Sequence, residues 1–429
     1  MCRSPDGWTP ERTRGFIAYG PLRGGFQGES SIVNELRIEK WVYGGDGLGR
    51  LDGRVVLAPF VLPGELARVD LKRANTDLLR ATRVEILDAA ADRVTPACPY
   101  FARCGGCHYQ HAPYEYQLAR KREILGEVLR RVGKIEPPAD IALIAGPPWE
   151  YRNRAQFHLH SGRIGYHEAG SRRLCPIERC PISSPVLNGA LTALRAMMRQ
   201  PRFPRFLDSI ELFTNETSVQ VNVREQADRR IARSFIEWCA GRIPGAAEPA
   251  LEYSAAGFSY RVSHRSFFQV NRFLIDKLVE TALEGAAGES AVDLYAGVGL
   301  FSLPLARRFS RLTAVESADS PMRDLEWNAA RAGLAVVPRR ETAEMFLENM
   351  AQPPDFLLAD PPRSGMSKAV VGHLARLQPR QVTIVSCDPS TLARDLAVLL
   401  GAGYRLAALT LVDLFPQTFH METVARLTL

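Results

Sequence analysis

The strongest constraint on the fold is an alternation of apolar strands and helical stretches that begins at about Phe258 and continues to the C-terminus. Each apolar run is short and ends in a polar or glycine-rich turn. This alternation predicts a doubly wound α/β domain built on a parallel sheet, similar to a Rossmann fold. The candidate strands are VDLYAGVGLF, RLTAVES, FLLADPP, QVTIVSCDP and RLAALTLVDLF.

The chain has 429 residues, too many for one ordinary domain, so we expect a multidomain protein. Residues 1–30 are rich in Gly, Pro, Arg and Ser and predict a flexible tail. Residues 31–90 contain short strands separated by turns such as GGDGLGR, which predicts a small OB-like β-barrel. Its basic residues fit either an RNA-facing surface or ordinary solvated charges: Arg37, Lys40, Arg50, Arg54, Lys72 and Arg73. Residues 91–255 predict an α+β central domain, and residues 256–429 form the predicted catalytic domain.

Charge and compartment restrict the function. Lysine and arginine exceed aspartate and glutamate by 54 − 47 = 7, a modest basic excess that favours a polyanionic partner. The N-terminus lacks an apolar signal region, and no stretch of membrane-spanning length is free of charges. We therefore expect a cytoplasmic protein without membrane association, and a monomer. Because disulfides are rare in the cytoplasm, clustered cysteines indicate metal or catalytic chemistry.

The first candidate strand leads into a glycine-rich turn typical of nucleotide-like cofactors. Gly297 and Gly299 allow the backbone to approach a ligand at a helix N-terminus. Glu316 ends the next strand, where a carboxylate accepts hydrogen bonds from ribose hydroxyls. Asp360 ends a later strand at the same predicted edge. This pattern fits NAD and S-adenosylmethionine equally well.

A cysteine and a glutamate supply candidate reactive groups. Cys387 lies in the segment Ser386-Cys387-Asp388-Pro389, which directly follows the strand QVTIV, and a helix starts after Pro389. We expect the helix N-terminus to lower the pKa of the thiol and favour the thiolate. Glu422 precedes the last apolar strand and would act as a general base if it is desolvated. The alternatives are a buried structural cysteine and a surface carboxylate.

Taken in order, the motifs resemble the RNA uracil-5-methyltransferase family. DLYAGVGLF, LADPPRSG, SCDPSTLARD and HMETV are similar to its catalytic motifs, and SFFQVN to the motif that opens its catalytic domain. GGDGLGR and LPGE resemble its N-terminal TRAM domain, and the cysteine block resembles its iron–sulfur module. The resemblance covers about residues 35–429.

The resemblance implies S-adenosyl-L-methionine as methyl donor and carbon 5 of a uracil in structured RNA as acceptor. It favours 23S rRNA, with transfer RNA as the second choice. It implies Cys387 as nucleophile and Glu422 as base. Some members carry Asn where this chain has Leu300, so we expect no polar side-chain contact there. The implied S-adenosylmethionine contacts are Gln269, Tyr295, Glu316 and Asp360.

The cysteine block is CPYFARCGGC, in which two glycines let the chain turn so that Cys98, Cys104 and Cys107 approach one another. Cys175 and Cys180 are both candidates for a fourth ligand. Four thiolates suit zinc or a [4Fe–4S] cluster, and the spacing leaves both open. The resemblance implies a [4Fe–4S] cluster with Cys180 as the fourth ligand. A radical S-adenosylmethionine enzyme is disfavoured, because its cluster keeps one iron without a thiolate.

Aromatic and cationic residues interleave around this block, which predicts RNA contacts and a flipped target base. Two other functions remain open. One is a catalytically silent RNA-binding protein on the same scaffold, which the presence of both Cys387 and Glu422 disfavours. The other is a cytosine-5 DNA methyltransferase, whose nucleophile follows proline, whereas Ser386 precedes it here. The interleaved residues are Tyr100, Phe101, Arg103, His108, Tyr109 and His111, and the strand segment Tyr151-Arg152-Asn153-Arg154 adds further candidates.

Overall fold

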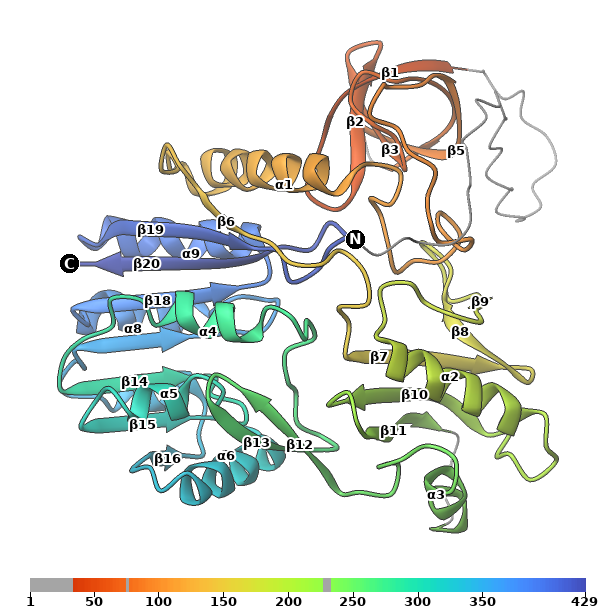
Figure 1. The fold of residues 1–429 in the computed structure, drawn as a ribbon. Helices are drawn as coiled ribbons and strands as arrows, with labels where there is room; N and C mark the ends of the chain where they lie inside the picture. Colours follow the sequence, from red (N-terminus) through yellow and green to blue (C-terminus); the bar gives the residue numbers. More distant parts are fainter. Residues whose placement is uncertain (1–33, 75–76, 227–232) are drawn as a thin grey trace, which may run out of the picture. The chain divides into compact units, whose positions relative to one another are not determined.

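The computed structural model describes residues 34–74, 77–226 and 233–429 (Figure 1). The tail predicted for residues 1–30 lies outside these ranges. None of the helices within the described ranges is both long and apolar enough to cross a membrane. The chain divides into two compact units. The smaller one ends at Arg93, and the larger one contains the turn Tyr43–Gly45 and everything from Val94 onward.

The smaller unit is a closed five-stranded barrel, which confirms the predicted OB-like domain. The strand order is β1-β2-β3-β5-β4, and β4 pairs with β1 to close the barrel. Apolar side chains that alternate along the strands fill the interior, among them Leu36, Ile38, Val56 and Val69. The strands are β1 (Asn34–Trp41), β2 (Asp46–Leu51), β3 (Arg54–Pro59), β4 (Leu66–Arg73) and β5 (Leu78–Asp88).

The prediction that GGDGLGR is entirely a turn was wrong. Only Gly44 and Gly45 form the turn, at φ values of 110° and 96°, and the remaining residues belong to β2. Gly49 lies inside that strand, and the site admits only glycine because a Cβ atom there would stand 2.4 Å from the carbonyl oxygen of Arg37. A glycine within a strand therefore marks close backbone approach in this barrel.

The central part of the larger unit is an antiparallel sheet with the order β11-β10-β7-β8-β9. Helix α2 packs Leu187, Leu191 and Leu194 into its core, and the Ser184 side chain caps the helix by accepting a hydrogen bond from the Leu187 amide. The elements are β7 (Arg154–His160), β8 (Arg163–His167), β9 (Leu174–Pro176), α2 (Pro185–Met198), β10 (Leu207–Thr214), β11 (Val219–Gln226) and α3 (Arg233–Ala240).

Two further pieces precede and follow this sheet along the chain. Helix α1 (Tyr114–Val128) comes before it and continues into a π-helical turn, η1 (Leu129–Gly133). After it, β12 (Ala250–Ala255) and β13 (Phe258–Ser263) form a hairpin that precedes the catalytic sheet.

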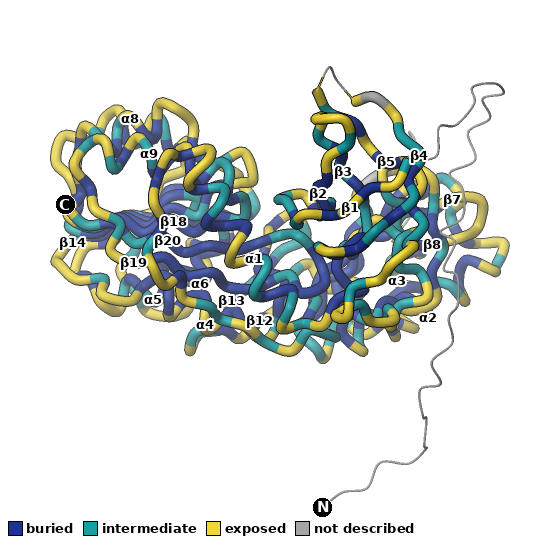
Figure 2. The backbone as a smooth tube through the Cα atoms, turned by 90° about the horizontal axis from the view of Figure 1, so that it is seen from above, coloured by how far each residue is buried: buried dark blue, intermediate teal, exposed yellow. Residues whose placement is uncertain are grey.

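The catalytic sheet has eight strands in the order β16-β15-β14-β17-β18-β20-β19-β6. Figure 2 shows its buried strands between α8 and α9 on one face and α4 and α5 on the other. The strands are β6 (Ala142–Ile144), β14 (Ser290–Leu294), β15 (Arg311–Val315), β16 (Val337–Arg339), β17 (Phe356–Ala359), β18 (Gln381–Ser386), β19 (Arg405–Val412) and β20 (Glu422–Thr428). The helices are α4 (Ile275–Ala282), α5 (Ser302–Ala306), α6 (Asp319–Arg331), α7 (Ala343–Glu348), α8 (Lys368–Leu377) and α9 (Pro389–Gly401).

The expected Rossmann-like sheet is present, but it is not wholly parallel. Strands β14 to β18 pair in parallel, whereas β20 runs antiparallel to both β18 and β19. The reason is the length of the β19–β20 connection, residues 413–421, because a parallel crossover needs about a dozen residues or more. β6, from the predicted central domain, pairs in parallel with β19 at the sheet edge.

The strand order reverses between β14 and β17, where the chain continues outward in opposite directions. Open α/β sheets bind ligands in the crevice outside the carboxyl ends of the strands at such a switch point. The sheet therefore indicates where a cofactor binds.

Candidate active site

Four residues predicted from the sequence directly follow the last residue of a parallel strand. Tyr295 follows β14, Glu316 follows β15, Asp360 follows β17 and Cys387 follows β18. Because β14, β15, β17 and β18 are parallel, their carboxyl ends lie at the same edge of the sheet. The structure therefore brings these four residues to the edge that contains the switch point.

Glu422 reaches the same edge from the opposite chain direction. It is the first residue of β20, which pairs antiparallel with β18, and the last pair in the register is Ser386 with Thr423. One step further along this register, Glu422 stands beside Cys387. Antiparallel pairing thus places the candidate base next to the candidate nucleophile.

The glycine-rich turn after β14 is tied to Glu316. The Gly297 amide donates to Glu316 Oε2 at 3.1 Å, and the Ala318 amide donates to Oε1 at 2.7 Å. Gly299 has a φ of 91°, and a Cβ atom there would lie 2.9 Å from Leu303 Cδ1. Tyr295 itself has a φ of 62°, an uncommon conformation for a residue other than glycine. The turn is therefore joined to the end of the next strand through the Gly297 amide and the Glu316 carboxylate.

A buried carboxyl group lies beneath this turn. Asp293, in β14, is fully buried, and the Ser302 hydroxyl donates a hydrogen bond to its Oδ2. Its Oδ1 has no hydrogen-bond partner in the structure. Burial raises the pKa of Asp293 to about 7.

Cys387 belongs to a group of interacting charges with Glu422, Asp360 and Arg363. Burial, followed by the nearby Glu422 carboxylate, raises the pKa of the Cys387 thiol to about 12, and Arg363 opposes this shift. Burial and Asp360 likewise raise the pKa of Glu422 well above its ordinary value, again opposed by Arg363. Burial raises the pKa of Asp360 to about 7. Burial therefore favours the protonated forms of one thiol and two carboxyl groups, and the Arg363 charge opposes this for Cys387 and Glu422.

The expectation that the neighbouring helix lowers the pKa of Cys387 was wrong. The N-terminus of α9 is capped by Asp388, whose Oδ1 accepts hydrogen bonds from the Ser390 and Thr391 amides at 2.8 and 3.0 Å. This carboxylate satisfies amides that would otherwise stabilise a thiolate. Burial then decides the direction of the shift.

Gln269 lies apart from the strand ends, in the segment between β13 and α4. It is buried, and its main-chain oxygen accepts a hydrogen bond from Asn153 Nδ2 at 3.1 Å. No hydrogen bond or ion pair within the described chain joins its side chain to the strand-end residues. Arg363, by contrast, joins the group although we assigned it no role from the sequence; a cation three residues after a strand-end carboxylate was the available signal.

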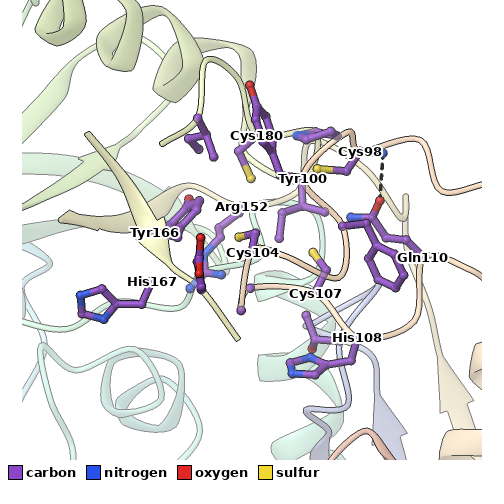
Figure 3. Close-up of a pocket in the computed structure, with 18 of the residues that line it drawn as sticks. Cys98, Tyr100, Cys104, Cys107, His108, Gln110, Arg152, Tyr166, His167 and Cys180 are labelled. Carbon is purple, nitrogen blue, oxygen red and sulfur yellow. Dashed lines mark hydrogen bonds between the residues drawn. The ribbon is translucent and has the colours of Figure 1, made fainter. Parts of the chain in front are cut away.

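The predicted cysteine ligands surround a second site, a cavity of about 400 Å³. Figure 3 shows the sulfur atoms of Cys98, Cys104, Cys107 and Cys180 turned toward a common space. Cys180 lines the cavity, whereas Cys175, the alternative fourth ligand, is fully buried in β9 and is not part of the lining. The same cavity extends to Arg363, Thr418 and His420.

In addition to burial, the charge of Cys180 contributes to raising the pKa values of the three thiols of the cysteine block, Cys98, Cys104 and Cys107. Burial and then repulsion by Cys180 raise the pKa of Cys107, and burial raises that of Cys104 to about 12. No group of three or more His, Cys, Asp or Glu in the described ranges is arranged to hold a metal ion.

A cation also lies at this cavity. Arg152 is half-buried and lines it, beside Tyr166 and the cysteines in Figure 3. Its Nε donates to the main-chain oxygen of Arg154, and it forms no ion pair with a carboxylate in the described part of the chain. A guanidinium among thiols favours an anionic occupant, since an unpaired charge is costly to bury.

Several of the predicted RNA contacts are core residues instead. Tyr109 and His111 are fully buried, and Tyr109 belongs to the packed interior rather than to the surface. Arg154 is buried and pairs with Glu211 at 2.7 Å. Aromatic and cationic residues in alternation therefore do not by themselves identify a binding face.

Sequence comparisons reveal similar proteins along nearly the whole chain. Residues 247–428 match the model of the tRNA (uracil-5-)-methyltransferase family. The 23S rRNA (uracil(1939)-C(5))-methyltransferase RlmD of Pseudomonas putida is 33% identical, with 91% of this chain and 92% of the relative covered. An uncharacterized RNA methyltransferase of Thermosynechococcus vestitus is 32% identical, with 92% and 97% covered.

A solved structure is similar over the same extent. It is the tRNA (uracil-54, C5)-methyltransferase of Pyrococcus abyssi in complex with S-adenosyl-L-homocysteine. The TM-score is 0.74 at 25% identity, and the match covers 92% of this chain and 99% of the other.

Proposed function

This chain belongs to the RNA uracil-5-methyltransferase family, and on that premise we propose that it transfers the methyl group of S-adenosylmethionine to carbon 5 of a uracil in 23S rRNA. The observation that carries the proposal is the pairing of β18 with β20, which sets Glu422 beside Cys387 at the ligand-binding edge of the sheet. Relatives named as 23S rRNA methyltransferases, at 33–34% identity over about nine-tenths of the chain, support the choice of RNA.

Carbon 5 of uracil is a poor nucleophile, so the reaction needs covalent help. In the proposed mechanism, the Cys387 thiolate adds to carbon 6, and the electrons of the ring double bond form an enolate. Carbon 5 then attacks the methyl carbon of S-adenosylmethionine, which releases S-adenosylhomocysteine. Glu422, in its carboxylate form at this step, next removes the proton from carbon 5 and becomes protonated. The electron pair of that C–H bond restores the ring double bond, and the Cys387 sulfur leaves carbon 6.

The charges around Cys387 suit these proton transfers. In the free site burial keeps the thiol protonated, so its proton must pass to a neighbouring carboxylate when the uracil binds. Asp360, whose pKa is raised to about 7, is a suitable acceptor at neutral pH. We assign Arg363 the role of stabilising the thiolate and the enolate oxygen, because its charge already opposes the upward shifts of Cys387 and Glu422.

We propose that the methyl donor binds at the switch point. Glu316, tied to the Gly297 amide, would accept hydrogen bonds from the ribose hydroxyls. Tyr295 and Asp360 flank the position of the methionine part at the ends of β14 and β17. Gln269 remains part of this proposal on the family resemblance alone.

We further propose that Cys98, Cys104, Cys107 and Cys180 hold a [4Fe–4S] cluster, in a cytoplasmic enzyme. Each thiolate of such a cluster binds a different iron, so its sulfurs surround a space instead of meeting at one ion, as zinc would require. The cavity size and the unpaired Arg152 charge fit an anionic occupant of this kind. When bound, the cluster would cross-link the cysteine loop to the segment before α2.

The function is tested with RNA in which 5-fluorouracil replaces uracil. After methyl transfer, carbon 5 carries fluorine and no removable proton, so the native enzyme should remain covalently attached to the RNA. Cys387→Ala should form no adduct and should retain S-adenosylmethionine binding. The absence of an adduct from the native enzyme on both 23S rRNA and tRNA would refute the mechanism. An adduct with tRNA alone would identify tRNA, and not 23S rRNA, as the substrate.

The cluster is tested by comparing two cysteine variants after anaerobic purification. Cys180→Ser should lose the brown colour and most of the bound iron, whereas Cys175→Ser, a buried cysteine outside the cavity lining, should keep both. A colourless native protein that contains zinc, or iron loss in Cys175→Ser alone, would contradict the proposed ligand set.

A further inference from the structure

The segment that delivers Glu422 to Cys387 is irregular but buried. It runs from residue 413 to residue 421 and connects β19 to β20 without helix or strand. Most of its residues are buried, including Asp413, Leu414 and Met421. The position of Glu422 therefore depends on what holds this segment, which we name the base segment.

Part of the base segment has an unfavourable backbone conformation. The Thr418 amide donates to the Phe415 carbonyl, with Pro416 and Gln417 between them. Gln417 has a φ of 68° in this turn, at the position where a type II turn favours glycine. A non-glycine residue there costs on the order of 1–2 kcal/mol, so neighbouring contacts must stabilise it.

Helix α1 provides these contacts through Gln117. Its Oε1 accepts a hydrogen bond from the Gln417 amide at 3.1 Å, and its Nε2 donates to Gln417 Oε1 at 3.0 Å. The Gln417 carbonyl accepts hydrogen bonds from the His108 and Tyr109 amides at 2.9 and 3.0 Å. His108 directly follows Cys107, so the cysteine loop and α1 hold the same residue.

A second anchor lies at the start of the base segment. Lys121, on α1, and Asp413 are both fully buried, and Nζ lies 2.6 Å from Oδ1. Lys121 also donates to the Phe415 carbonyl at 3.0 Å, and the Tyr114 hydroxyl donates to Asp413 Oδ2 at 2.9 Å. One helix face thus binds the base segment at both its start and its turn.

We infer that α1 sets the position of the catalytic base, with Gln117, Lys121 and Tyr114 as positioning residues for Glu422. Within the part of the chain that the structure describes, these residues form no hydrogen bond or ion pair with Cys387 or Glu422; they hold the segment whose last residue precedes β20. The inference rests on the proposed role of Glu422. It predicts a defect confined to proton removal, the last chemical step, and not in RNA binding, donor binding or thiolate addition.

The test uses Gln117→Leu with natural uracil RNA and with 5-fluorouracil RNA. In the variant, kcat should fall roughly 100-fold, the effect of misplacing a catalytic group by about 1 Å, with kcat/KM for RNA unchanged because the steps up to methyl transfer stay intact. Because methyl transfer precedes proton removal, a covalent methylated adduct should accumulate on natural RNA, where the native enzyme shows none. With 5-fluorouracil RNA, both proteins should form the adduct.

The matched control is Gln220→Leu. Gln220 is another fully buried glutamine in the larger unit, on β11, with a hydrogen bond to the Val262 carbonyl and none to the base segment. It should turn over normally and leave no adduct on natural RNA. Gln117→Leu that behaves like this control overturns the inference. So does loss of turnover without an adduct on either RNA, because the defect would then precede proton removal.

If Gln117→Leu does not fold, Tyr114→Phe decides, since it removes one hydrogen bond to Asp413 and leaves no cavity. This variant should accumulate the same adduct at a lower level, and the absence of the adduct would overturn the inference. A native enzyme that fails to react with 5-fluorouracil RNA would instead refute the proposed function. The two failures are therefore distinguishable.

Discussion

The reactivity of Cys387 in the free enzyme is the most direct test of the electrostatics of the site. A thiol with an ordinary pKa near 8.5 is about one-quarter ionised at pH 8. With a pKa of about 12, only about one Cys387 thiol in 10,000 is ionised at that pH. Alkylation of Cys387 should therefore be slow at neutral pH, although the residue is only half-buried.

The pH profile separates this explanation from poor access. Iodoacetamide reacts with the thiolate, so the Cys387 rate should rise about 100-fold between pH 8 and pH 10, whereas an ordinary thiol rises about fourfold and levels off. Poor access lowers the rate at every pH alike and leaves the shape of the profile unchanged. The rate is measured by mass spectrometry of the Cys387 peptide, with the unfolded protein as reference.

Two variants test whether each neighbouring charge raises or lowers the pKa of Cys387. Arg363→Met should move the profile to higher pH because Arg363 lowers the pKa of Cys387, and Glu422→Gln should move it to lower pH because the carboxylate raises that pKa. A native profile that levels off below pH 9 would refute the reasoning, and so would an Arg363→Met profile shifted to lower pH.

Three further predictions concern the base, the buried acid and the glycine turn. Glu422→Gln should accumulate a covalent methylated adduct on natural uracil RNA, visible on a denaturing gel, because only proton removal is blocked; multiple turnovers without adduct would exclude it as the base. Asp293 is fully buried with a pKa of about 7 against about 3.9 when unfolded, so ionisation opposes folding as pH rises from about 4 to about 7. Between pH 5 and pH 8, the free energy of unfolding of Asp293→Asn, measured with urea, should therefore rise by about 3 kcal/mol relative to that of the native protein. An equal pH dependence of the two proteins would contradict this. Gly299→Ala should lower both stability and S-adenosylmethionine affinity more than Gly297→Ala in calorimetry, because a Cβ atom meets Leu303 at 2.9 Å at the first position and nothing within 4 Å at the second.

The strand-end residues were predictable because their placement follows from local sequence. Tyr295, Glu316, Asp360 and Cys387 each come directly after an apolar run, and the ends of parallel strands meet at one edge. The five-stranded barrel followed from the same kind of local pattern. Where one strand ends is a short-range property of the chain, so a sequence alone specifies it.

Properties that depend on distant partners were not predictable. The sign of the pKa shift of Cys387 depends on burial and on the way Asp388 caps α9. Gln117 and Lys121 are polar residues on a helix, where sequence patterns indicate a solvated face. They are buried because of their partners in the base segment, and Asp413 lies 292 residues away from Lys121 along the chain.

These long-range contacts change what counts as the catalytic domain. Residues 256–429 contain the proposed nucleophile, the proposed base and the proposed donor site, yet their sheet is completed by β6, which pairs with β19 next to the base segment. The base segment is held by α1 and by the cysteine loop, which also lie outside that range. Without them Asp413 would lose its cation, and the positive φ of Gln417 would lose its stabilising hydrogen bonds. Folding of the α1 region and proton removal at Glu422 are thus coupled, so selection on catalysis acts on a helix that never touches the substrate uracil in the proposed mechanism.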